Sequence, residues 1–179
     1  MTMFKHYIPK AILLTVRFTG THFTRSLLAH LGNVYIPNAH WLDQEVKDEW
    51  EKIKLRKVIV TVRDPRLSAI RAIKSRSPSA VEDIANEWNT MIDSLDQLDH
   101  FIFNIECQNR LEHAYELIDF IGIQPMRKIE PFVNKWAPEN FSTHDAKVKY
   151  LESGELPEGH NWDALQPAID WYNSLTTRA

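Results

Sequence analysis

Three short apolar runs stand out in the hydrophobic pattern of the chain. "AILLTV" (Ala11–Val16) and "KVIVTV" (Lys57–Val62) are almost wholly apolar, and "HFIFNIE" (His100–Glu106) is a third run. Uninterrupted apolar runs of this length are typical of strands that are covered on both faces, as in a parallel sheet. We therefore expect three central strands at these positions.

Between and after these runs the apolar residues take helical spacing. Helices are predicted over Thr21–Leu31 and over the charged, amphipathic stretch Asp43–Leu55. The clearest helix is "SPSAVEDIANEWNTMIDSLDQL", where apolar residues recur at steps of three and four. Ser79 and Glu82 have capping-box spacing at its start, so they are predicted to close the first turn.

Toward the end of the chain, two more helices flank a stretch without any period. "NRLEHAYELIDFIG" is predicted to stop at Gly122, and "DALQPAIDWYNSL" begins with Asp163 and Gln166 at capping-box spacing. The stretch between them, "KWAPENFSTHDAKVKYLESGELPEGHNW", predicts a long loop. Strands that alternate with helices, without repeats or linkers, predict one α/β domain over residues 1–179. We expect three layers, with a parallel sheet in the middle and helices on both of its faces.

Composition narrows the function classes. The 179 residues carry a formal net charge of −3, which argues against nucleic acid or a membrane surface as a partner of the whole molecule. Cys107 is the only cysteine, so no disulfide can form within the chain. The start, "MTMFKHYIPKAILLTV", lacks the features of a signal peptide, and no apolar run is long enough to span a bilayer. We expect a cytoplasmic protein.

The stretch "TVRFTGTHFTRSLL" has the parts of an anion cradle. It closes the first predicted strand, turns at Gly20 and opens a helix, whose first N–H groups and dipole favour a bound anion. Thr19 and Thr21 add hydroxyl donors, and Arg17 can form a bidentate contact with phosphate or sulfate. It is not a Walker loop, which needs two glycines followed by lysine and Ser or Thr. An ordinary strand-to-helix turn is the alternative.

A second strand end carries the same kind of chemistry. In "KVIVTVRDPRLSAIRAIKS", Arg63 follows the strand, and Asp64 and Pro65 suit a helix start. Arg63, Arg66, Arg71 and Lys74 concentrate positive charge in an otherwise acidic chain. The carboxyl ends of neighbouring parallel strands meet at one sheet edge, where open α/β folds bind their ligands.

These two stretches together resemble the nucleotide-binding elements of the PAPS-dependent sulfotransferases, whose fold is related to that of the P-loop nucleotide kinases. The donor of that family is 3′-phosphoadenosine 5′-phosphosulfate (PAPS). "AHWLDQEVKDEWEKIKLRKVIVTVRDP" has a histidine at nearly the family's spacing, and "FIFNIECQNRLEHAYELIDFIGIQP" is similar to the family's late strand and helix. The resemblance spans roughly Ala11 to Pro125.

The resemblance implies a role for each matching residue. Backbone N–H groups around Thr19, Gly20, Thr21 and His22 would cradle the 5′-phosphosulfate, with Arg17 beside them, and Phe23 would stack on adenine. Arg63, with Arg71 where the family has a serine, would bind the 3′-phosphate. His40 would be the catalytic base that takes the proton of a hydroxyl or amine of a small-molecule or glycan acceptor. No metal is needed, and no cluster of ligand residues has metal-binding spacing.

The chain departs from the family pattern at two functional positions. Phe18 stands where most members have the lysine that contacts the leaving group, and Arg17 lies one residue earlier. Arg17 would take the catalytic role of that lysine if the chain bulges, and Arg25, Lys147 and Lys149 are candidates to replace it. The late Arg-Lys-Gly element of the family is not recognisable. The first hypothesis is a sulfotransferase; a non-catalytic module that binds PAP, the desulfated nucleotide, is the alternative, and a phosphate-transferring kinase relative is a third.

Overall fold

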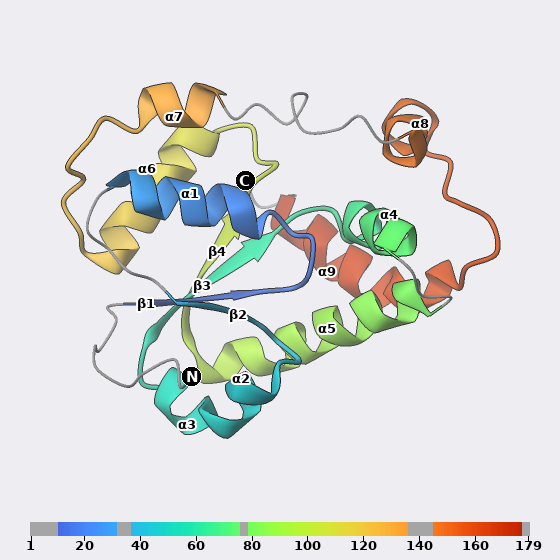
Figure 1. The fold of residues 1–179 in the computed structure, drawn as a ribbon, viewed down its shortest axis with the longest axis horizontal. Coiled ribbons are helices and arrows are strands. Elements are labelled where there is room, and N and C mark those ends of the chain that lie inside the picture. Colours follow the sequence, from blue (N-terminus) through green and yellow to red (C-terminus); the bar gives the residue numbers. More distant parts are fainter. Residues whose placement is uncertain (1–10, 32–36, 76–78, 136–144, 177–179) are drawn as a thin grey trace.

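The computed structural model describes residues 11–31, 37–75, 79–135 and 145–176. The protein is an α/β protein with a four-stranded, all-parallel sheet flanked by helices (Figure 1). Trp136, a candidate for an acceptor pocket by its sequence context, lies outside the described residues.

The sheet contains the three predicted strands and one that the pattern missed. Its strands are β1 (Ala11–Thr15), β2 (Asn38–His40), β3 (Lys57–Val62) and β4 (Asp99–Asn104), in the order β2-β1-β3-β4. The three predicted strands are confirmed, with ends that shift by one or two residues. β2 is only three residues long, too short for any hydrophobic period, and it forms through pairing with β1.

Two apolar layers cover the two faces of the sheet. The layer that contains Leu13 packs against α1 (Thr21–Leu31), α6 (Arg110–Ile121) and α7 (Glu130–Lys135). The layer that contains Leu14 packs against α4 (Pro65–Ser75), α5 (Ala80–Ser94) and α9 (Gln166–Thr176). Adjacent residues of β1 thus enter opposite layers, as a strand with two buried faces requires.

This arrangement creates a switch point between β1 and β3. The helix after β1 covers one face of the sheet, and the helix after β3 covers the other. β1 pairs with β3 on one side and with β2 on the other, with Thr15 opposite both Thr61 and His40. The connections therefore diverge at the carboxyl edge of β1, which is where α/β sheets open a binding crevice.

Several sequence expectations need correction. The stretch Asp43–Leu55 forms two short helices, α2 (Gln44–Asp48) and α3 (Trp50–Ile53), because the helix breaks at Glu49. The predicted late loop contains a helix, α8 (Asp145–Ser153). Tyr150 of this helix is half-buried against α4, a contact that the polar sequence of the stretch does not indicate.

The two predicted capping boxes do not form as expected. Ser79 flanks α5, but it makes no side-chain cap hydrogen bond, and its hydroxyl donates to Asp83 Oδ2 at 3.3 Å instead. The last helix is preceded by a 3₁₀ turn, Trp162–Leu165, so Asp163 lies inside that turn. Gly122 does end α6 as predicted, with φ +71° in the left-handed region.

Candidate functional site

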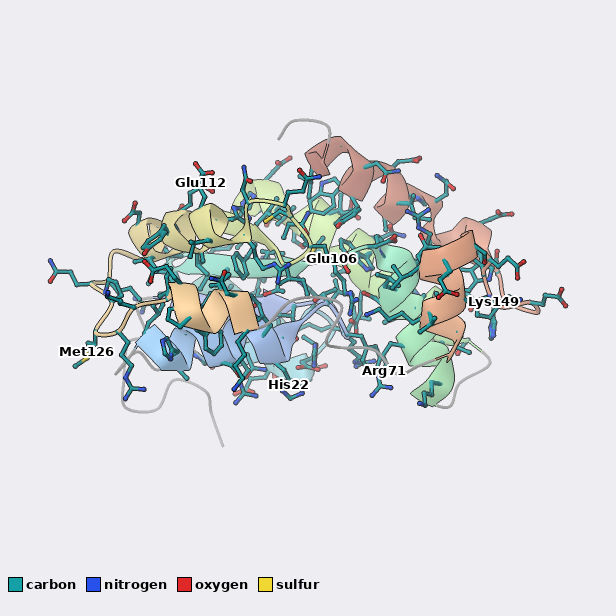
Figure 2. The ribbon with its side chains drawn as sticks, turned by 90° about the horizontal axis from the view of Figure 1, so that it is seen from above. His22, Arg71, Glu106, Glu112, Met126 and Lys149 are labelled. Atoms are coloured by element: carbon teal, nitrogen blue, oxygen red, sulfur yellow. The ribbon has the colours of Figure 1, made fainter. Side chains whose placement is uncertain are left out.

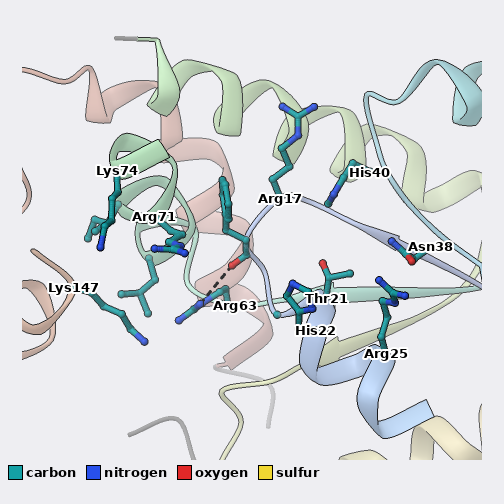
Figure 3. A pocket seen from close by; sticks show the side chains of 14 residues that line it. Arg17, Thr21, His22, Arg25, Asn38, His40, Arg63, Arg71, Lys74 and Lys147 are labelled. Carbon is teal, nitrogen blue, oxygen red and sulfur yellow. Dashed lines mark hydrogen bonds between the residues drawn. The ribbon is translucent and has the colours of Figure 1, made fainter. Parts of the chain in front are cut away.

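A cavity of about 700 Å³ opens at the carboxyl ends of β1, β2 and β3 (Figure 3). The residues that line it come from the loop after β1, from α1, from β2, from the end of β3, and from α4 and α8. They are Arg17, Phe18, Gly20, Thr21, His22, Arg25, Asn38, His40, Arg63, Leu67, Ile70, Arg71, Lys74 and Lys147.

The wall of this cavity is strongly basic. Four arginines and two lysines line it, and no carboxylate does so among the residues that the structure describes. The whole chain carries an excess of acidic over basic side chains, so this concentration of cations is local. Cations that face one another across a partly enclosed space favour an anionic ligand, which removes their mutual repulsion.

The loop between β1 and α1 has a backbone that few residues other than glycine adopt. Phe18 has φ +64° and Gly20 has φ +96°. A Cβ on Gly20 would overlap Ile105 Cδ1, so a side chain is excluded there both by conformation and by space. The turn leads into α1. The backbone N–H groups of Thr21 and His22 lie in its first turn, so no preceding helical turn offers them a carbonyl as hydrogen-bond acceptor.

The two threonines of the loop have different positions. Thr19 is fully buried and its hydroxyl donates to the carbonyl of Val16 at 2.7 Å, so this side chain holds the turn rather than lining the cavity. Thr21 lines the cavity, and its hydroxyl donates to Thr15 Oγ1 at 3.1 Å. The sequence predicts that the Thr19 hydroxyl donates to a bound anion, but in the structure it stabilises the turn instead.

Phe23 is placed where it cannot stack on a ligand in the cavity. Its side chain is only 6% exposed and packs between Phe103 and Phe132, with ring centroids 6.0 Å away in both cases. The expectation of adenine stacking fails because Phe23 falls on the core face of α1, the face that also carries Leu27.

Arg17 is bound to a buried carboxylate. Its backbone N–H donates to Glu87 Oε2 at 2.7 Å, and its Nε lies 3.1 Å from Glu87 Oε1. Burial raises the pKa of Glu87, while Arg17 and His40 favour the charged form. Arg17 reaches the cavity wall as expected, but Glu87 on α5 directs its guanidinium and neutralises much of its charge.

Arg63 is held by a carboxylate from the end of β4. Its Nη2 lies 3.2 Å from Glu106 Oε1, and Glu106 Oε2 accepts the backbone N–H of Asp64 at 2.7 Å. Tyr172 on α9 also donates its hydroxyl to Glu106 Oε2 at 3.3 Å. Its Nη1 donates to the Phe18 carbonyl at 3.5 Å (Figure 3), and its Nε is buried without a hydrogen-bond partner in the described part of the chain. Glu106 thus orients Arg63 at the cavity without saturating it.

Lys147 enters the same end of the cavity from α8. It is half-buried, and both burial and the nearby Arg63 lower its pKa, while Glu106 acts in the opposite direction. Tyr150 anchors the helix, because its hydroxyl donates to Asp64 Oδ2 at 2.8 Å and its ring lies under the guanidinium of Arg66. Of the two lysines considered as replacements for the one missing at Phe18, Lys147 lines the cavity, at the end where Arg63 lies.

Lys149 is directed outward from α8 (Figure 2), where it forms an ion pair with Glu155. Arg25, the third candidate, lines the opposite end of the cavity.

His40 ends β2 with its ring fixed on one side. Its Nδ1 lies 3.3 Å from the Thr15 carbonyl oxygen and 3.2 Å from Thr15 Oγ1. A carbonyl can only accept, so a hydrogen on Nδ1 satisfies this contact and leaves the Nε2 lone pair for another proton. The backbone N–H of His40 donates to Asp43 Oδ2 at 2.8 Å, which fixes the turn after β2.

The structure thus gathers most of the expected site residues and adds others. Seven of the nine line the cavity: Arg17, Gly20, Thr21, His22, His40, Arg63 and Arg71. Sequence reasoning missed Glu87 and Glu106, which orient the two arginines from distant elements. Lys74, one of the four cations that follow the second strand, also lines the cavity, because its spacing of three residues from Arg71 puts both on one face of α4.

No protein-family model matches the chain, and comparison with curated proteins gives no match either. Within the described segments, no three His, Cys, Asp or Glu side chains gather in a way that could hold a metal ion. In the same segments, no helix has the length and apolarity needed to cross a bilayer.

Proposed function

We propose that this protein is a small sulfotransferase that binds PAPS in the basic cavity and transfers its sulfuryl group to a hydroxyl or amine. The observation that carries the proposal is the charge of that cavity: six cations and no carboxylate among its described lining residues, around a glycine turn that opens a helix. These cations lie at both ends of the cavity, so they suit a ligand with more than one anionic group. PAPS carries anionic groups at both ends of its ribose.

The residues present fit such a nucleotide. The first turn of α1, with the Thr21 hydroxyl, would hold the 5′-phosphosulfate, because helix N-termini favour anions. Arg63, Arg71 and Lys147 would hold the 3′-phosphate at the other end. Gly20 lines the cavity, and its φ of +96° makes the turn that places the start of α1 at the cavity wall.

PAPS supplies a sulfuryl group on a phosphate leaving group, and this chain's residues have to orient the acceptor and take its proton. His40 suits the second task, since a hydrogen on its Nδ1 would bond the Thr15 carbonyl at 3.3 Å and its Nε2 could then take the acceptor proton. Positioning and charge stabilisation carry most of such a transfer, as in phosphoryl transfer. The proposal thus needs no metal.

A non-catalytic module that binds PAP is the second candidate. Two observations favour it: Phe18 occupies the position of the family's lysine, and Arg17 is tied to Glu87. Both observations concern the leaving group, and neither weakens the nucleotide end of the cavity, where Arg63 and Lys147 remain.

Calorimetric titration with PAP, beside ADP and ATP, tests the site that both candidates share. Micromolar or tighter binding of PAP, with much weaker binding of ADP and ATP, supports it; absence of PAP binding refutes both. Incubation with radiolabelled PAPS and a panel of hydroxyl and amine acceptors then separates the two. Labelled product, or release of PAP that depends on acceptor, supports the enzyme, whereas tight binding with no turnover on any acceptor supports the module.

A further inference from the structure

The cavity extends across β1 to a second end, away from Arg63, Arg71 and Lys147, the residues proposed to hold the 3′-phosphate. β3 and β2 pair with opposite sides of β1, so Arg63 and His40 lie on opposite sides of Thr15. Beyond His40 the lining consists of Asn38 from β2 and of His22 and Arg25 from α1. Figure 3 shows these side chains on the side of the loop opposite to Arg71, Lys74 and Lys147.

Arg25 gives this end of the cavity its charge. It lies one helical turn after Thr21, whose hydroxyl is bonded to Thr15, so both residues are on the face of α1 that borders the cavity. Arg25 is exposed and forms no ion pair with any carboxylate in the described part of the chain. Arg17, by contrast, is neutralised by Glu87. Asn38 adds amide donors beside Arg25.

We propose that the acceptor is itself an anion: a hydroxyl compound whose carboxylate, sulfate or sulfonate group binds Arg25 while its hydroxyl faces His40. This inference rests on the proposed function, because it assigns the acceptor class of the same site. In the transfer, the acceptor oxygen forms a bond to sulfur and the sulfur–phosphate oxygen bond breaks, with its electron pair leaving on PAP. The hydroxyl proton goes to His40 Nε2 and from there to solvent.

An anion at this end would also be disfavoured without Arg25, because the transferred group is itself negative. A cation beside the acceptor's anionic group offsets that repulsion. A charged hydrogen bond to an arginine is worth roughly tenfold or more in affinity. The anionic group of the acceptor therefore sets specificity at this end, while His40 acts on its hydroxyl.

The test uses PAP-saturated protein and three matched phenols. PAP binding is measured first, by calorimetry; the protein is then titrated with 4-hydroxyphenylacetate, 4-hydroxybenzenesulfonate and the neutral 4-ethylphenol. We expect at least one anion to bind about tenfold more tightly than 4-ethylphenol. Arg25→Gln removes this preference and Arg25→Glu reverses it, with PAP affinity changed less than twofold. Lys149→Gln, which removes an exposed lysine outside the cavity, leaves both unchanged.

The outcomes separate this inference from the proposed function. Failure to bind PAP refutes the proposed function and the inference with it. Binding of PAP together with equal affinity for the three phenols, or with no binding of any of them, refutes only the anionic acceptor. An anion preference that survives Arg25→Gln refutes the assignment to Arg25. The two anions also distinguish an acceptor with a carboxylate from one with a sulfonate.

Discussion

Substitution of Gly20 by alanine tests whether both the backbone conformation and the side chain of Ile105 require glycine in the loop after β1. An alanine at φ +96° is strained by about 1–2 kcal/mol, since this backbone region disfavours side chains. Its Cβ would also overlap Ile105 Cδ1 and lie 3.3 Å from Ile105 Cγ1. Overpacking of this kind costs about 1–3 kcal/mol. We therefore expect Gly20→Ala to lower the free energy of unfolding by about 2–5 kcal/mol.

Gly122 provides the matched control. It has φ +71°, but an added Cβ would meet nothing within 4 Å, so Gly122→Ala carries the backbone strain alone, about 1–2 kcal/mol. Urea unfolding, followed by circular dichroism, measures both variants. Ile105→Val removes the overlapping Cδ1 atom, so in that background Gly20→Ala should cost about as much as Gly122→Ala. Equal costs for Gly20→Ala and Gly122→Ala in the wild-type background would show that Ile105 does not press on the turn.

Three further predictions concern the cavity. Arg63→Met should weaken PAP binding roughly 10- to 100-fold in calorimetry and weaken 5′-AMP binding much less, because AMP lacks the 3′-phosphate; equal losses for both nucleotides would contradict the assignment. Lys147→Met should weaken PAP binding roughly tenfold, whereas Lys149→Met should not. Burial and Arg63 lower the pKa of Lys147, and a bound phosphate raises it again. PAP binding should therefore take up protons at the alkaline pH where the free lysine loses its proton, and it should weaken as pH rises through that range. Calorimetry in buffers of different ionisation enthalpy measures this uptake, which Lys147→Met should abolish; uptake that persists in the variant would assign it to another group. His40→Asn should abolish transfer from PAPS and leave PAP affinity within about twofold; a loss of PAP binding would instead make His40 a structural residue.

The strands and main helices could be predicted from local pattern because each depends on neighbours in the sequence. Ala11–Val16 and Lys57–Val62 are apolar enough to require cover on both faces, and they form β1 and β3. α8 could not be predicted, since a short polar helix is stabilised by its contacts with α4 rather than by a period of its own. β2 depends in the same way on its pairing with β1.

The cavity residues also fall into those that the local sequence predicts and those that depend on contacts with distant elements. Arg17, Arg63 and His40 could be found because they follow strands or stand at a recognisable spacing from them. Phe23 was assigned to the ligand although its position on α1 points it into the core, and the helical period around Leu27 carries that information. Glu87 and Glu106 left no local signal, because a carboxylate that pairs with a distant arginine resembles any other charged residue in the sequence.

The sequence by itself determined which segments become buried strands, where a glycine turn opens a helix, and that arginines follow two strands. These properties follow from residue type and spacing, which act over a few residues. Only the tertiary structure decided that Arg17 pairs with Glu87 and Arg63 with Glu106, and that Lys147 and Arg25 occupy opposite ends of one cavity. Charge balance and burial depend on which elements the fold brings together, and those elements lie far apart along the chain.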